Sequence, residues 1–222
     1  MKVIITGFEP LENWPSNASE ILLRSLETRA LDADESLGLE ISYELIPART
    51  GELRRIAAEL MSRDAGAILL LGQAAQRNRL ALERFALNWV EFAKPDASGA
   101  IASGAEIEPG APHAFKSSLP ELEEIAAELT AEGVPCYVSN HAGTSLCNQL
   151  LYLLLHLEHS RPRGAGSKTR IGFLHVPLLP EQVGGDWATC PCLPLEMERQ
   201  ASLRILRRLN IAPAENKRGS IK

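Results

Sequence analysis

The 222-residue sequence has no excess of basic residues, no long apolar run and no regular cysteine pattern. Its 23 lysines and arginines are outnumbered by 28 aspartates and glutamates, so it lacks the basic face that a nucleic-acid partner requires. The most apolar run, residues 150–157, is far too short to span a bilayer. At the start, the apolar run covers only residues 3–5 and Glu9 and Pro10 follow soon after, which does not fit a signal peptide. We therefore expect a cytoplasmic protein with no nucleic-acid partner and no membrane partner.

The cysteines do not form a recognisable framework. They are Cys136, Cys147, Cys190 and Cys192. Thiols stay reduced in the cytoplasm, so a disulfide frame is not expected there. No histidine and cysteine pair repeats at the spacing of a zinc site. The sequence therefore predicts free thiols and no structural metal.

Segments typical of buried strands alternate with segments typical of amphipathic helices along most of the chain. The predicted strands are residues 2–6, 39–47, 67–72, 134–139 and 171–177, and the predicted helices are 17–31, 50–61, 119–132, 145–159 and 195–209. This alternation predicts a three-layer α/β/α fold with a mostly parallel, twisted central sheet. We expect a single domain over residues 1–211 and a mobile tail over 212–222. Residues 80–90 alternate between apolar and polar positions, and the following residues 94–112, rich in glycine, proline and serine, are expected to form a long loop or a hairpin. Thr50 is placed to cap a helix.

Polar residues follow the ends of several predicted strands. They are Gly7-Phe8, Gly72-Gln73, Ser139-Asn140-His141 and His175. In a parallel sheet the carboxyl ends of the strands meet at one edge, and ligand sites gather there. We therefore expect one edge to carry a glycine turn, an amide, a histidine and the loop that leads to Cys147.

Cys147 closely follows Thr144 and Ser145, and either residue is a suitable helix cap. In the first turn of a helix, the free N–H groups and the helix dipole would stabilise a thiolate, and the same N–H groups would form an oxyanion hole. The alternative is a small cysteine that packs beneath the helix, since free cysteines are commonly buried. The pattern of this segment alone favours the second interpretation.

His175 and Glu83 are the other candidates for chemistry. A nucleophilic cysteine needs a base, and the imidazole gains from a third polar group that orients it. His175 ends an apolar strand and is equally well explained as a core histidine bonded to the backbone. Glu83 is a candidate orienting group, but an exposed strand carboxylate or a salt bridge to Arg84 would also explain it. The weaker candidates for the base are His113, His141, His156 and His159.

Six stretches together resemble the pyroglutamyl peptidase I family of cysteine peptidases. They are VIITGFEP (3–10), GQAAQR (72–77), LALERFALN (80–88), EPGAPHAFKSSLP (108–120), GVPCYVSNHAGTSLCNQLLY (133–152) and FLHVPLLPEQ (173–182). The resemblance follows the family's order through most of the chain. It implies a homotetramer that removes an N-terminal pyroglutamyl residue from peptides without a cofactor. It implies that Cys147 is the nucleophile, His175 the base and Glu83 the carboxylate that orients the base.

The resemblance also identifies substrate-binding residues. Phe8 matches an aromatic wall of the pocket, and Gln73 matches an amide near the pyroglutamyl ring, whose N–H and C=O groups need partners. Leu11 stands where the family usually has a second aromatic residue, and Trp14 is a candidate to replace it. Ala93 stands where the family has an arginine close to the reacting centre. These departures leave two alternatives open: a relative that hydrolyses another N-acyl or lactam-type amide, and a catalytically silent binding protein on the same fold.

Overall fold

The computed structural model describes residues 1–11, 14–28, 38–92, 94–162 and 168–210. Ala93 and the tail expected over residues 212–222 lie outside the described residues. The strands are β1 (Lys2–Phe8), β2 (Glu40–Ile46), β3 (Ala67–Gln73), β4 (Leu80–Glu83), β5 (Phe85–Leu87), β6 (Val90–Phe92), β7 (Ala102–Ala105), β8 (Ala114–Lys116), β9 (Cys136–Ser139) and β10 (Arg170–Val176). The α-helices are α1 (Ala18–Thr28), α3 (Leu53–Ser62), α4 (Leu122–Ala131), α5 (Leu146–Ser160) and α6 (Leu195–Asn210), and the short 3-10 turns are η1 (Thr50–Glu52), η2 (Pro180–Gln182) and η3 (Gly185–Trp187).

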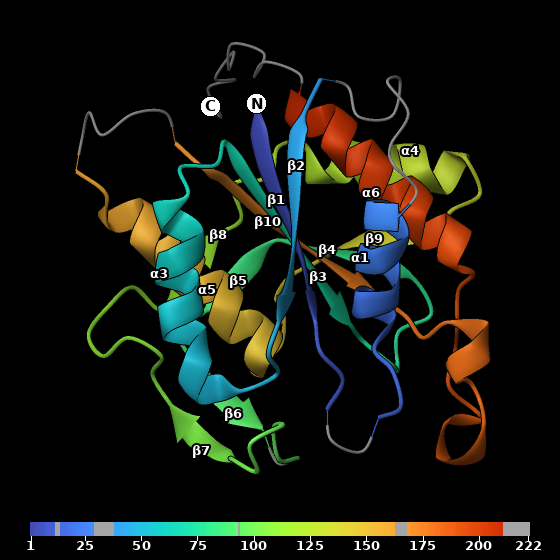
Figure 1. Cartoon of the computed structure of the whole chain (residues 1–222), viewed down its shortest axis with the longest axis horizontal. Helices are drawn as coiled ribbons and strands as arrows, with labels where there is room; N and C mark the ends of the chain where they lie inside the picture. Colours follow the sequence, from blue (N-terminus) through green and yellow to red (C-terminus); the bar gives the residue numbers. More distant parts are fainter. Residues whose placement is uncertain (12–13, 29–37, 93, 163–167, 211–222) are drawn as a thin grey trace, which may run out of the picture.

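The central sheet of the described residues has six strands in the order β2-β1-β3-β10-β4-β9 (Figure 1). Strands β2, β1, β3 and β10 are parallel, whereas β4 pairs antiparallel with β10 and parallel with β9. The prediction of a mostly parallel, twisted sheet is therefore confirmed. Side chains on both faces of β1, β3 and β10 are buried, which explains why these strands are almost continuous apolar runs in the sequence.

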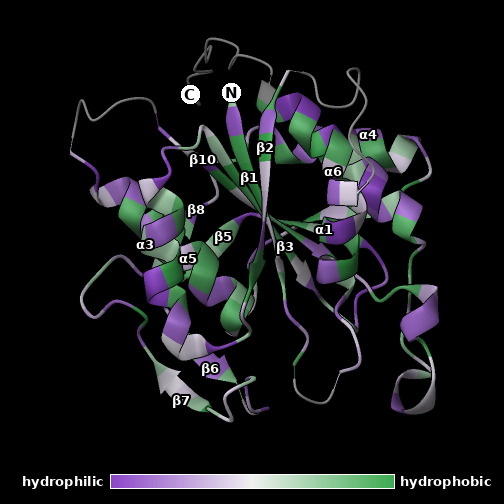
Figure 2. Ribbon diagram, in the orientation of Figure 1, coloured by the Kyte–Doolittle hydropathy of each residue, from purple (hydrophilic) through white to green (hydrophobic). Residues whose placement is uncertain are grey.

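Helices cover both faces of the sheet and complete the three layers. Helices α1, α4 and α6 pack on one face, and α3 and α5 pack on the other (Figure 1). Figure 2 shows that α3 and α6 alternate between hydrophobic and hydrophilic residues, as expected of helices with one face in solvent. Helix α5 is more deeply buried, and its leucines fill the core beside Phe173 of β10. No helix in the described part of the chain is long and apolar enough to cross a membrane.

The alternating segment 80–90 forms short strands, and the hairpin expected from the residues after it is confirmed. Strand β4 joins the central sheet, β5 pairs with β8, and β6 with β7 forms an antiparallel hairpin. The connection of this hairpin is organised by Asp96, whose Oδ1 accepts hydrogen bonds from the N–H groups of Ser98 and Ala100 at 2.8 and 3.0 Å. Its Oδ2 accepts a bond of 2.7 Å from the N–H of Thr50, which fixes the hairpin to the start of α3.

Two local predictions were wrong. Thr50 does not cap α3, because residues Thr50–Glu52 form a 3-10 turn and the Thr50 hydroxyl donates to the side chain of Gln149 at 2.6 Å. The second concerns Ser139, which was expected at the sheet edge where β1, β3 and β10 end. Strand β9 is antiparallel to these strands, so its carboxyl end at Ser139 points away from that edge. The loop after Ser139 therefore returns across the sheet to bring Cys147 to that edge.

Candidate active site

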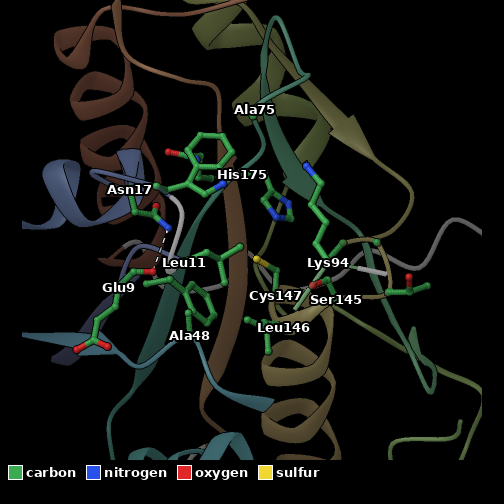
Figure 3. Close-up of a pocket in the computed structure, with 16 residues that line it drawn as sticks. Glu9, Leu11, Asn17, Ala48, Ala75, Lys94, Ser145, Leu146, Cys147 and His175 are labelled. Carbon is green, nitrogen blue, oxygen red and sulfur yellow. Dashed lines mark hydrogen bonds between the residues drawn. The ribbon is translucent and has the colours of Figure 1, made fainter. Parts of the chain in front are cut away.

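A cavity of about 270 Å³ lies beyond the carboxyl ends of β1 and β3, against the first turn of α5 (Figure 3). Five of the six predicted site residues line it, namely Phe8, Leu11, Gln73, Cys147 and His175. In Figure 3 the sulfur of Cys147 points toward the ring of His175. The sixth residue, Glu83, is fully buried and hydrogen-bonded to His175. Segments that lie far apart in the sequence thus meet at one cavity.

The end of β1 is held in place by the cap of α1. Asn17 precedes the helix, and its Oδ1 accepts hydrogen bonds from the N–H and the hydroxyl of Ser19 at 2.9 and 2.8 Å. The Ser19 hydroxyl in turn accepts a bond of 3.0 Å from the N–H of Phe8. A side chain at Gly7 would begin 2.6 Å from the carbonyl oxygen of Ser19, so this close approach requires glycine. This cap of α1 fixes Phe8 in the wall of the cavity.

Gln73, at the end of β3, has a fixed amide orientation. Its Oε1 accepts hydrogen bonds from the N–H of Ala18 at 2.7 Å and from Nε2 of Gln182 at 2.9 Å. A backbone N–H can only donate, so the oxygen and nitrogen of the Gln73 amide are unambiguously assigned. No hydrogen bond within the described residues uses Gln73 Nε2. The cavity wall therefore keeps an N–H donor available for a ligand.

The first turn of α5 carries Cys147 at its second helical position. Ser145 accepts the first helical hydrogen bond from Gln149 at 3.0 Å, but its side chain makes no cap bond to the first turn. The preceding Thr144 is fixed to β6 by two hydrogen bonds with the backbone of Glu91, at 2.8 and 2.9 Å. The predicted helix start is confirmed. Backbone N–H groups of the first turn lie next to the thiol, where they are placed to bind an anion.

Asn148, the residue after Cys147, anchors this turn to the adjoining strands. It is fully buried, and its side chain exchanges two hydrogen bonds with the backbone of Leu87 at 2.8 and 2.9 Å. Its Nδ2 also donates to the carbonyl oxygen of Trp89 at 3.0 Å. A buried amide with three good partners is rigid. The position of Cys147 is therefore set on both sides, by Thr144 before it and by Asn148 after it.

Cys147 is partly buried, and its thiol packs closely against β3. A side chain at Gly72 would begin 2.9 Å from the sulfur and 2.6 Å from the Phe173 ring, so glycine at this position makes room for the thiol. Burial raises the pKa of Cys147 to about 12, with a further contribution from the negative charge of Glu83. In this resting pocket burial outweighs the stabilisation of a thiolate that the helix N-terminus offers. Cys147 therefore rests as a neutral thiol.

His175 and Glu83 form a buried hydrogen-bonded pair on neighbouring strands. The Nδ1 of His175 lies 2.7 Å from Oε1 of Glu83. The antiparallel register pairs His175 with Ala81, so Glu83 lies diagonally across from His175 on the same face of the sheet. Nη1 of Arg77 donates to the same carboxylate oxygen at 2.6 Å. The alternative of a salt bridge from Glu83 to Arg84 is excluded, because the Arg84 guanidinium pairs with another carboxylate.

The partners of Glu83 and His175 determine their charges. Burial alone would raise the pKa of Glu83, but its hydrogen-bonding and electrostatic interactions with His175 and the positive charge of Arg77 lower it below its ordinary value. Burial lowers the pKa of His175 and outweighs the hydrogen bond and charge of Glu83, which raise it. The pair therefore rests as a carboxylate and a neutral imidazole. With Nδ1–H donated to Glu83, Nε2 is the nitrogen that accepts a proton.

Several residues that shape the site were missed in the sequence. Arg77 and Gln182 lie in stretches that resemble the family, but the sequence assigns them no role. Lys94 and Trp14 line the cavity. Trp187 packs against Trp14, with the centroids of the two rings 4.0 Å apart. The candidate histidines 113, 141, 156 and 159 do not line the cavity.

A cysteine at a helix start, facing a histidine that a buried glutamate holds, is the arrangement of a cysteine-type hydrolase. The model of a family described as pyroglutamyl peptidase matches residues 1–208. A pyrrolidone-carboxylate peptidase of Pyrococcus furiosus is 33% identical over 205 residues, which cover 90% of this chain and 94% of the relative. A pyrrolidone-carboxylate peptidase 1 of Ralstonia nicotianae is 36% identical over 185 residues, covering 82% and 81%.

Solved structures give the same result. The pyrrolidone carboxyl peptidase of Thermus thermophilus superimposes with a TM-score of 0.80 at 30% identity, covering 93% of this chain and 99% of that one. Pyroglutamyl peptidase I of Bacillus amyloliquefaciens gives 0.80 at 32% identity, covering 92% and 94%. The chain therefore belongs to the pyroglutamyl peptidase family, and the resemblance of its sequence motifs is confirmed. As a member of that family it is a peptidase of the cysteine type.

Proposed function

We propose that the protein removes the N-terminal pyroglutamyl residue of peptides, with Cys147, His175 and Glu83 as its catalytic triad. The observation that carries this assignment is the 2.7 Å hydrogen bond between His175 and the buried Glu83, in the cavity wall that Cys147 faces. A buried carboxylate costs free energy unless it is paired, and here its partner is the ring that faces the thiol. The fold alone would not require this arrangement.

The reaction begins from neutral partners. His175 Nε2 takes the proton of the Cys147 thiol as the sulfur attacks the exocyclic carbonyl carbon of the pyroglutamyl residue. Glu83 stabilises the imidazolium that forms, and N–H groups of the first turn of α5 bind the oxyanion. The imidazolium then gives its proton to the departing amine as the C–N bond breaks. Water, deprotonated by His175, hydrolyses the thioester and releases pyroglutamate and the free thiol.

The pyroglutamyl ring is assigned to the wall built by Phe8, Leu11 and Gln73. Phe8 is almost fully buried and offers an apolar ring, and Leu11 adds a second apolar surface. The Nε2 of Gln73 supplies a donor for the carbonyl oxygen of the lactam. Trp14 also lines the cavity. Leaving a buried lactam group unpaired would cost about 1–3 kcal/mol, so the single amide contributes strongly to recognition.

We further propose that the protein is cytoplasmic and works as a homotetramer with no cofactor. The four free cysteines support a reducing compartment. Light scattering coupled to gel filtration tests the assembly directly. A mass near four times 24.2 kDa supports the tetramer, and a monomer or dimer at working concentration contradicts it.

The activity is tested with a pyroglutamyl amide of aminomethylcoumarin. Wild-type protein should release the fluorophore, and iodoacetamide should stop the release. Cys147→Ala should abolish turnover, whereas Cys136→Ala should retain it, because Cys136 is buried under α4 and lines no part of the cavity. Equal residual activity in the two variants would remove Cys147 from the mechanism. A thiol that iodoacetamide labels without any pyroglutamyl release would instead favour another N-acyl amide as the substrate.

A further inference from the structure

Two tryptophans and a lysine from three separate segments converge at the rim of the cavity. Trp14 follows β1, Trp187 ends η3, and Lys94 follows β6. The ring centroids of Trp14 and Trp187 are 4.0 Å apart, and Nζ of Lys94 lies 5.3 Å from the centre of the Trp187 ring. Trp14 and Lys94 also line the cavity itself. We refer to Trp14, Trp187 and Lys94 as the rim cluster.

Lys94 brings an uncompensated positive charge to the cavity. None of the ion pairs within the described residues involves Lys94, and its only charged interaction there is with the face of Trp187. The other formally charged side chain of the lining is Glu9, and Figure 3 shows its carboxylate turned away from Cys147. Deeper in the site, the carboxylate of Glu83 is already balanced by Arg77. Among the described residues that line the cavity, Lys94 is therefore the cation that a ligand meets.

The position of Lys94 relative to the ring wall indicates which part of a substrate it would meet. Figure 3 shows Leu11 and Lys94 on opposite sides of Cys147. The proposed wall for the pyroglutamyl ring lies on the side of Leu11 and Phe8. With the scissile carbonyl at the sulfur, the chain after the scissile bond continues on the side of Lys94. That part of the substrate is the first residue of the released product.

We infer that the rim cluster is a specificity site for a carboxylate on the residue released by cleavage, with Lys94 as the cation that binds it. The inference rests on the proposed function and names a preference within it. Trp187 holds the ammonium group over its ring, and Trp14 supports Trp187, so the cation is kept near the cavity instead of extending into solvent. The carboxylate has two possible sources: the free C-terminus of a pyroglutamyl dipeptide, or an acidic side chain at the first released position.

Three substrates separate these sources: pyroglutamyl-alanine, pyroglutamyl-alanine amide and pyroglutamyl-aspartic acid amide. Pyroglutamyl-alanine and pyroglutamyl-aspartic acid amide each carry one carboxylate, and pyroglutamyl-alanine amide carries none. The readout is the ratio of kcat/KM for each carboxylate-bearing substrate to kcat/KM for pyroglutamyl-alanine amide, measured by release of the free amine. In the wild-type enzyme we expect a ratio of about 2 to 5, the range that a partly exposed ion pair supports. Preference for pyroglutamyl-alanine alone identifies the C-terminal carboxylate, and preference for both acids means that either source is accepted.

Lys94→Met should bring the ratio to about 1, and Lys94→Arg should retain it, because only the second keeps the charge. The matched control is Lys2→Met, which removes an exposed lysine at the opposite end of β1 and should leave the ratio unchanged. Each ratio is taken within one variant, so a change in the amount of folded enzyme cancels. Raising the ionic strength on the wild-type enzyme should reduce the ratio without any substitution.

A wild-type ratio of 1, or an undiminished ratio in Lys94→Met, overturns the inference. The proposed function has a different failure, in which no pyroglutamyl substrate is hydrolysed, including the coumarin amide. An active enzyme without carboxylate preference therefore rejects only the role of the rim cluster.

Discussion

Glu83 and Glu198 are both fully buried, but they are stabilised in opposite charge states. Glu83 on β4 has the imidazole of His175 at 2.7 Å and the guanidinium of Arg77 at 2.6 Å, and its pKa is lowered. Glu198 on α6 has no hydrogen bond to either carboxylate oxygen within the described residues. Burial raises its pKa to about 9, with a smaller contribution from the charge of Glu181. Burial alone therefore keeps a carboxylic acid neutral, and a buried negative charge requires cationic or hydrogen-bonding partners.

The ionised Glu83 bears on the proposed catalysis, whereas the neutral Glu198 bears on the stability of the fold. In the proposed mechanism, the charge of Glu83 holds the imidazole of His175 in one tautomer and stabilises its protonated form. The neutral acid of Glu198 lies in the core between α6 and the sheet, where it contributes no contact to the cavity. Substitutions at the two positions should accordingly change different properties of the protein.

The largest effect is expected from Glu83→Gln. The amide has nearly the same shape, but it carries no charge and can present an N–H to Nδ1 of His175, which favours the wrong tautomer. We expect kcat/KM for the coumarin amide to fall by about 10³- to 10⁴-fold. Glu198→Gln is the matched control and should keep full activity. Circular dichroism verifies that both variants are folded, and a loss below tenfold in folded Glu83→Gln would exclude Glu83 from the triad.

A smaller effect is expected from Arg77→Met. The positive charge of Arg77 lowers the pKa of both Glu83 and His175, so its removal raises both. His175 must be neutral to act as a base, and the acid limb of the kcat/KM profile should therefore move to higher pH, with a loss of about tenfold at pH 7. Arg77→Lys should restore part of the shift. Arg84→Met, which removes a cation paired with the exposed Glu123, should leave the profile in place. An unmoved acid limb in Arg77→Met would contradict this role.

The smallest effect is expected in the stability of Glu198→Gln. The pKa of Glu198 rises from 4.5 to about 9 on folding, so its contribution to stability is complete below pH 4.5 and is lost as the pH rises toward 9. The glutamine does not titrate. We expect the variant to be close to the wild-type protein at pH 5 and to exceed it in free energy of unfolding by an amount that grows with each pH unit up to pH 8. Urea titrations at the two pH values measure this, and a difference that does not grow with pH would show that Glu198 is ionised in the folded protein.

The sequence predicts most of the fold because its main strands are apolar runs and its helices have a regular apolar spacing. The ranges of β1, β3 and β10 follow directly, and the start of α5 places Cys147 correctly. The pairing of Glu83 with His175 could not be derived from spacing, because it depends on the short strand β4 running against β10. The residues offered Glu83 only as one candidate to orient His175, and the resemblance to a family made that pairing specific.

Other features of the molecule were not predicted from the sequence, each for a different reason. The role of Arg77 depends on a side-chain contact across a turn that no periodic pattern records. The rim cluster brings together residues 14, 94 and 187, and their order in the chain gives no indication that they meet. For Glu198 a signal was present: it lies three and seven residues before the apolar positions Ala201 and Ile205, on the buried face of α6. An acidic residue at such a position predicts a neutral carboxylic acid.

The fixed amide of Gln73 has a consequence for the choice between similar rings. Because Ala18 and Gln182 both donate to its oxygen, this side chain cannot rotate to offer an acceptor without breaking two hydrogen bonds. In the proposed binding mode, Nε2 of Gln73 donates to a carbonyl oxygen on the ring carbon next to the nitrogen, so a ring without that oxygen leaves the donor unpaired. An N-terminal proline has a methylene group there, and its ring nitrogen is charged. The discrimination between these two five-membered rings would then be decided outside the cavity, by the cap of α1 and the turn at η2.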